Sequence, residues 1–201
     1  MTPGLSAVLL AAGRSTRMGR DKALLEIDGT PLWRRQRDVL VRAGATEIFL
    51  SARADQPWAH EPEVAKNFTA IVRDSTPDAG PLAGLSAALV RAAHPHLAVL
   101  AIDLPKMNAG WFASLVAECA PAVGCVGRHA GCEKFFEPLA AIYPRELAQP
   151  AAAALARGEF SLQQFLSAAV AAGKMHVREI TAAETLRFEN WNAPASLPRR
   201  E

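Results

Sequence analysis

Small residues, glycines and cations are concentrated in one short stretch of this 201-residue chain. The stretch contains, in chain order, Leu10, Ala11, Ala12, Gly13, Arg17, Gly19 and Lys22. Its small side chains let a ligand come close to the backbone, and its glycines permit backbone angles that other residues resist. Arginine offers a planar fork to phosphate oxygens, and lysine offers a compact ammonium group. Because a polyphosphate needs backbone N–H donors and cations around its oxygens, the stretch predicts a cradle for a nucleoside triphosphate.

This cradle matches neither of two common phosphate-binding motifs. No Gly-Lys-Ser/Thr follows at the spacing of a Walker A loop, and the glycines lack the GxGxxG spacing. An ordinary small-residue turn between a strand and a helix, carrying surface cations, is the alternative interpretation of this stretch taken alone.

Acidic residues follow two of the predicted strands. They are Asp74, after the strand predicted at 70–72, and Asp103, after the strand predicted at 97–102. The carboxyl ends of strands in an open α/β sheet form its ligand-binding edge, so both carboxylates are expected beside Arg17 and Lys22. Asp103 can hold Mg²⁺, because a metal that arrives with a triphosphate needs only one or two carboxylates from the protein. Helix capping and loop ordering are the alternative roles of these acids.

Residues 80–84 read Gly-Pro-Leu-Ala-Gly and begin a predicted helix. The small residues at this helix start would let a base or a ribose pack closely against Gly80, Pro81 and Leu82. Tight packing of the helix itself is the alternative reason for the two glycines.

Apolar runs alternate with helical patterns along most of the chain. Strands are predicted at residues 7–10, 47–51, 70–72, 97–102, 122–126, 138–143 and 177–180. Helices are predicted from Pro31 to Gly44 with Thr30 as the cap, at 80–93, after the cap Asn108, at 150–157, and at 161–172 before Gly173. The alternation predicts the α/β class, as a three-layer α/β/α sandwich with a mostly parallel sheet.

Length and charge narrow the class of protein. The chain is long enough for one large domain, predicted at 1–197, with a frayed tail at 198–201. A net charge of +2 with dispersed basic residues predicts neither a nucleic-acid partner nor a membrane partner. Because no secretory signal pattern or membrane-length apolar segment is evident, a cytoplasmic protein is expected.

The three cysteines, Cys119, Cys125 and Cys132, lie in one region near His129. A metal or redox site is one interpretation of this grouping. The cysteines do not form the CxxC pairs of structural zinc sites, and an odd number does not make a disulfide framework. Ordinary core or surface thiols are therefore the favoured interpretation.

Several motifs follow one another along nearly the whole chain. They lie at residues 10–13, Ser15, 17–19, 21–22, 29–32, Asp74, 80–84, 103–105, 138–139 and 190–194. Together they resemble the molybdenum cofactor guanylyltransferase family. The resemblance implies a Rossmann-like nucleotidyltransferase that moves GMP from GTP to the phosphate of molybdopterin, with Mg²⁺ and release of pyrophosphate. It also implies transient contact with cofactor-biosynthesis proteins or apo-molybdoenzymes.

The same resemblance implies a role for each matching residue. Nucleotide binding would fall to Leu10, Ala11, Ala12, Gly13, Gly19, Lys22, Ser51, Asp74, Gly80, Pro81, Leu82 and Asp103. Arg17, Lys22 and Asp103 would act in catalysis, with Mg²⁺ on Asp103. Asn190 and Asn192 match an Asn-x-Asn-x-Pro motif that the family associates with the pterin.

Two positions depart from the family pattern. Ala12 stands where the usual Leu-Ala-Gly-Gly loop has its first glycine, and the Leu-Ala-Ala-Gly form is more typical of enzymes that use CTP. Ser51 replaces an asparagine and can make fewer hydrogen bonds. A CTP-dependent molybdenum cofactor cytidylyltransferase and a sugar-phosphate nucleotidyltransferase therefore stay open, as does an adaptor that binds a nucleotide and delivers the cofactor without turnover.

Overall fold

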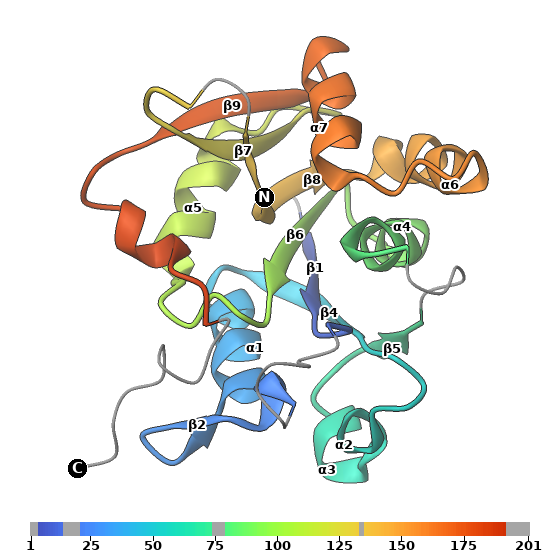
Figure 1. Cartoon of the computed structure of the whole chain (residues 1–201), viewed down its shortest axis with the longest axis vertical. Helices are drawn as coiled ribbons and strands as arrows, with labels where there is room; N and C mark the ends of the chain where they lie inside the picture. The colour runs from blue at the N-terminus through green and yellow to red at the C-terminus, as the bar shows by residue number, and fades with distance from the viewer. Residues whose placement is uncertain (1–3, 14–20, 74–78, 133–134, 192–201) are drawn as a thin grey trace.

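A single mixed sheet runs through the middle of the computed structural model, which describes residues 4–13, 21–73, 79–132 and 135–191 (Figure 1). Its seven strands lie in the order β5-β4-β1-β6-β8-β7-β9. Their bounds are β1 (Leu5–Leu10), β4 (Ala45–Ser51), β5 (Ala70–Val72), β6 (His96–Ala101), β7 (Gly124–His129), β8 (Glu137–Pro144) and β9 (Met175–Ile180). Only β8 runs antiparallel to its neighbours β6 and β7. The prediction of a mostly parallel sheet is confirmed.

Helices cover both faces of this sheet (Figure 1). One face carries α1 (Leu32–Arg42) and α5 (Ala109–Glu118), and the other carries α4 (Pro81–Arg91), α6 (Ala148–Ala156) and α7 (Leu162–Ala171). Ala7 and Leu9 of β1 join the first core, whereas Val8 and Leu10 join the second. Because successive side chains of a strand point to opposite faces, a strand covered on both sides must be apolar throughout. The predicted three-layer sandwich is confirmed. Among the described residues, no helix has the length and hydropathy needed to cross a membrane.

The start of α1 differs from the prediction. Thr30 does not cap the helix but pairs with Ile27, in a hairpin of β2 (Glu26–Ile27) and β3 (Thr30–Pro31). Asp28 and Gly29 form the two-residue turn with φ of 51° and 71°. Positive φ at both turn residues matches the twist of a tight hairpin, so the chain makes a β-turn before it enters the helix. Pro31, with extended backbone, then takes the N-cap position.

Short helical segments were not predicted. They are η1 (Lys22–Leu24), α2 (Pro57–His60), α3 (Pro62–Ala65), η2 (Arg145–Leu147) and η3 (Thr185–Phe188). Segments of three or four residues are too short to show a helical period in the sequence. The predicted cap Asn108 accepts a hydrogen bond from the Trp111 N–H at 3.1 Å. Ser161, predicted as the first residue of its helix, is the N-cap instead and accepts a hydrogen bond from the Gln164 N–H at 3.3 Å.

The cysteines have the character of ordinary thiols. All three are free, and Cys125 lies in the core. Burial raises the pKa of the Cys119 and Cys125 thiols to about 12. Within the described ranges, no group of three or more His, Cys, Asp or Glu side chains could hold a metal ion. The burial of Cys125 agrees with its interpretation as a core thiol.

Glu184 holds the chain after β9 through a dense set of hydrogen bonds. Its carboxylate accepts from Arg178 at 3.0 Å and 3.1 Å, from Arg187 at 3.1 Å, and from the backbone and side chain of Thr181. Burial alone would raise the pKa of Glu184, but the hydrogen bonds from Arg178 and Thr181 outweigh it and lower the pKa to about 2.

Glu184→Gln is expected to lower the free energy of unfolding at neutral pH by about 2 kcal/mol, because it removes a buried charge from two arginines. Because the folded pKa lies below the unfolded value, this stabilisation is present above about pH 5 and is lost as the pH falls toward about pH 2. Urea unfolding at about pH 7 and about pH 3 should therefore show the difference between wild type and variant shrinking in acid. Glu159→Gln, which breaks the exposed pair with Arg157, is the matched control and should change little. A difference that grows in acid would contradict the prediction.

Candidate active site

A cavity of about 430 Å³ lies at the carboxyl ends of β1, β4 and β6. Its lining residues are Leu10, Ala12, Gly13, Lys22, Ser51, Arg53, Gly80, Pro81, Gly84, Ala101, Ile102, Asp103 and Leu139. Because β1 pairs in parallel with both β4 and β6, the segments that follow these strands meet at one edge of the sheet. This is the edge at which open α/β sheets bind ligands, and the volume suits a small molecule.

Most of the described residues that the sequence placed at a nucleotide line this cavity. They are Leu10, Ala12, Gly13, Lys22, Ser51, Gly80, Pro81 and Asp103. Ala11 and Leu82 instead lie in the two cores beneath it, at 1% and 0% exposure. Arg17, Gly19, Asp74 and Asn192 lie outside the described residues.

Lys22 and Asp103 form the charged centre of the cavity. The Lys22 Nζ lies 3.5 Å from the Asp103 Oδ2, with the two side chains 13% and 23% exposed. Lys22 begins η1, whose cap Asp21 accepts a hydrogen bond from the Ala23 N–H at 3.1 Å. Asp103 lies two residues beyond the end of β6. Two elements far apart in sequence therefore bring a cation and a carboxylate together at the cavity wall.

The start of α4 forms a second wall. Gly80 has φ 66° and ψ −161°, a conformation that favours glycine, and Pro81 is the first residue of the helix. The positive end of the helix dipole therefore lies at the cavity. Gly84 makes the fit close, since a Cβ there would lie 2.6 Å from the Ser51 Oγ and 2.8 Å from the Leu10 Cδ2. The start of α4 therefore packs closely against β1 and β4 and also forms part of the cavity wall.

Ser51 is a buried polar side chain at the cavity wall. The residue is 1% exposed, and its hydroxyl makes no hydrogen bond to any other residue that the structure describes. The hydroxyl faces the cavity, so a ligand there can form a hydrogen bond with it.

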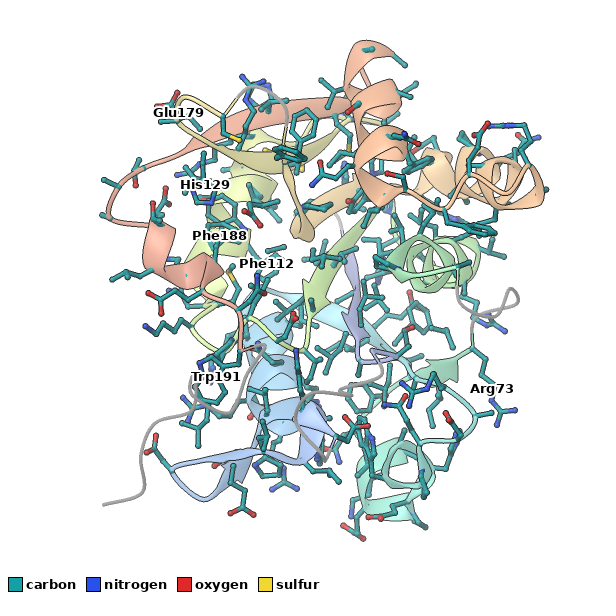
Figure 2. The ribbon with its side chains drawn as sticks, viewed as in Figure 1. Arg73, Phe112, His129, Glu179, Phe188 and Trp191 are labelled. Carbon is teal, nitrogen blue, oxygen red and sulfur yellow. The ribbon has the colours of Figure 1, made fainter. Side chains whose placement is uncertain are left out.

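Sequence reasoning missed Arg53, which lies two residues beyond the end of β4 and lines the cavity. Its Nη1 donates to the Ala12 O at 2.6 Å and to the Gly13 O at 2.9 Å. The rule that places ligand-binding residues just beyond the carboxyl ends of the strands could have identified Arg53 as well. Arg73, which follows β5, is exposed and projects outward from the edge of the molecule, away from the cavity lining (Figure 2).

The C-terminal segment returns to the Asp103 turn. Phe188 packs edge-on against Trp111 at 5.0 Å and against His129 at 5.4 Å, and Figure 2 shows His129 and Phe188 together. Beyond it, the Trp191 N–H donates to the Asp103 O at 3.0 Å. Asn190, which the sequence placed at an acceptor, is exposed beside this contact and is not among the cavity-lining residues.

The donor set at the cavity suits a metal that arrives with its substrate. Asp103 is the one carboxylate among the described residues of the lining, so the protein offers no closed cage there. Mg²⁺ keeps several waters and is commonly held by one or two carboxylates together with substrate phosphates. Asp103, partly exposed to the cavity, fits that pattern.

Comparison with known proteins agrees with this geometry. The model of the MobA-like NTP transferase domain matches residues 7–174. The chain is 42% identical over 198 residues to a probable molybdenum cofactor guanylyltransferase of Opitutus terrae, covering 97% of this chain and 94% of that protein. It is 33% identical over 200 residues to a molybdenum cofactor guanylyltransferase of Pseudomonas paraeruginosa, covering 98% of this chain and 94% of that one.

A solved structure shares the fold. Molybdopterin-guanine dinucleotide biosynthesis protein A from Archaeoglobus fulgidus has a TM-score of 0.71 and 21% identity, covering 94% of this chain and 93% of that one. The family model spans most of the chain, and the two curated relatives match almost its full length. With a cation and a carboxylate at the carboxyl ends of a mostly parallel sheet, the chain belongs to the MobA-like NTP transferase family and is a nucleotidyltransferase.

Proposed function

We propose that this nucleotidyltransferase moves GMP from GTP to the terminal phosphate of molybdopterin, with Mg²⁺, and releases pyrophosphate. The observation that carries the proposal is the 3.5 Å approach of Lys22 and Asp103 at the cavity wall. The names of the two curated relatives supply the choice of nucleotide and acceptor. Delivery of the product through transient contact with apo-molybdoenzymes is the corresponding proposal for partners.

The proposed reaction is an in-line displacement. An oxygen of the acceptor phosphate forms a bond to the α-phosphorus of GTP, while the bond from that phosphorus to the bridging oxygen of the leaving pyrophosphate breaks. The acceptor phosphate is already anionic near neutral pH, so the site needs no strong general base. The protein's task is to position the two phosphates and to stabilise the charge that develops on the leaving group.

The described residues divide this work between them. Lys22 stabilises the charge on the phosphates and on the departing pyrophosphate. Asp103 would hold Mg²⁺, which when bound neutralises phosphate charge. Ser51 offers its hydroxyl to the nucleoside beside the start of α4. Roles for Arg17 and Gly19 at the phosphates, for Asp74 at the nucleoside, and for Asn190 and Asn192 at the pterin stay proposals from the resemblance.

Pyrophosphate release tests this function directly. The protein would be incubated with Mg²⁺ and GTP, CTP, ATP or UTP, and with molybdopterin or a sugar phosphate as acceptor. Release that requires GTP and molybdopterin is the expected result. Release that prefers CTP would identify a cytidylyltransferase, the alternative suggested by Ala12. Release with the sugar phosphate alone would identify a sugar-phosphate nucleotidyltransferase. Binding of GTP without release would indicate the delivery adaptor instead.

A further inference from the structure

We infer that Arg53 and Gln56 form a carbonyl clamp that turns the backbone N–H groups of Ala12 and Gly13 toward the phosphates of the nucleotide. The inference rests on the proposed nucleotide site and adds two positioning residues to it. Neither residue needs to touch the reacting atoms for this role. Both act through the direction of the backbone that follows β1.

The clamp grips three successive carbonyl groups. The Gln56 Nε2 donates to the Ala11 O at 3.0 Å. The Arg53 Nη1 donates to the next two carbonyls, the Ala12 O at 2.6 Å and the Gly13 O at 2.9 Å. The carbonyl oxygens of this turn are therefore all directed toward one segment, which begins two residues after β4.

Peptide geometry then fixes where the N–H groups point. In a planar trans peptide unit the C=O and the N–H point in opposite directions. With the Ala11 and Ala12 carbonyls held by the clamp, the N–H groups of Ala12 and Gly13 must point away from it. Both residues line the cavity, and neither N–H donates to another residue in the described part of the chain. Adjacent, unused backbone donors are what an anion-binding turn presents.

The clamp is itself held in place. Gln56 is 2% exposed, and its Oε1 accepts a hydrogen bond from the Arg53 N–H at 2.7 Å. The Gln56 Nε2 also donates to the Asp21 Oδ2 at 2.6 Å, and the Trp58 Nε1 donates to the same oxygen at 2.8 Å. Because Asp21 precedes Lys22, residues 53–58 fix the cradle on both sides, at Ala11–Gly13 and at the start of η1.

The positive charge of Arg53 offers a competing explanation, in which its guanidinium binds phosphate directly. Arg53 carries a carboxylate partner, since its Nε lies 2.8 Å from the Asp55 Oδ1. Removing that carboxylate leaves both carbonyl contacts in place and unmasks the arginine charge. The two explanations therefore predict different behaviour for Asp55→Asn, whose side chain is 76% exposed in the wild type.

The test compares binding of a triphosphate with binding of the bare nucleoside. Arg53→Met keeps the apolar stem and removes the guanidinium that donates to both carbonyls. It is expected to weaken binding of Mg²⁺-GTP by about tenfold, measured by calorimetry. Binding of guanosine, followed by saturation-transfer NMR, should change by less than about twofold, because the nucleoside has no phosphate. Arg35→Met is the matched control, since Arg35 also donates to a backbone carbonyl, the Ile27 O at 3.3 Å, but does not line the cavity.

Asp55→Asn should bind Mg²⁺-GTP like the wild type, whereas tighter binding would overturn the clamp in favour of direct charge. Wild-type affinity for GTP in Arg53→Met would overturn it, and so would equal losses for GTP and guanosine. Failure of the wild-type protein to bind GTP would overturn the proposed function, and this inference with it. Thermal melts establish that each variant is folded, and Arg53 is exposed enough for its replacement to leave the core intact.

Discussion

Replacing Lys22 with alanine is expected to lower the rate of GTP-dependent pyrophosphate release by roughly a hundredfold to a thousandfold. The ammonium group is held at the cavity wall, 3.5 Å from the Asp103 Oδ2 and only 13% exposed. A charge screened from water stabilises developing negative charge far more than an exposed one does. Because this stabilisation acts mainly in the transition state, kcat should fall more than the affinity for GTP. Steady-state kinetics with a coupled pyrophosphate assay would measure both.

Lys66→Ala provides the control for this variant. Lys66 pairs with Glu63 at 2.6 Å and its side chain is 62% exposed, so its loss removes a lysine without touching the cavity. Its turnover should stay within about twofold of the wild type. Near-normal turnover by Lys22→Ala, in a protein with an unchanged melting temperature, would remove Lys22 from the catalytic role.

The site's position was predictable from the sequence because it depends on the order of the elements. Once strands alternate with helices, the residues after parallel strands must meet at one edge of the sheet. Gly13 and Asp103 follow β1 and β6, Ser51 is the last residue of β4, and all three line one cavity. Arg53 obeys the same rule and was overlooked because an arginine in a loop is usually a solvated surface residue.

The contacts that shape the cradle were not predictable in this way. The hydrogen bond from Arg53 to Ala12 spans 41 residues, and that from Gln56 to Ala11 spans 45. Such contacts depend on how two loops sit together, which no local propensity specifies. The role of Thr30 was predicted wrongly for a local reason. A threonine before a helix can either cap the helix or continue a hairpin strand, and both roles fit the sequence. The tight turn at Asp28-Gly29 places Thr30 in the hairpin strand.

The proposed metal ligand gives the second large effect. Asp103→Asn keeps the shape of the side chain and the backbone bond from Trp191, but it removes the carboxylate charge. Turnover is expected to fall by about a hundredfold or more, because an amide is a weak ligand for a hard cation and the phosphates lose that neutralisation. The Mg²⁺ concentration that gives half-maximal activity should also rise. Asp38→Asn, on α1 and paired with Arg37 at 3.0 Å, is the control and should leave both quantities unchanged.

A double variant separates the metal role of Asp103 from mere support of Lys22. If Asp103 served only to orient the ammonium group, Asp103→Asn would have no further effect on a Lys22→Ala background, and the Mg²⁺ requirement would not move. If Asp103 holds the metal, its loss shifts the Mg²⁺ requirement whether or not Lys22 is present. Because losses of residues that act together do not add, the rate of the double variant does not by itself separate the two roles of Asp103. The Mg²⁺ titration on the Lys22→Ala background is therefore decisive, because a mere salt-bridge partner would leave it unchanged.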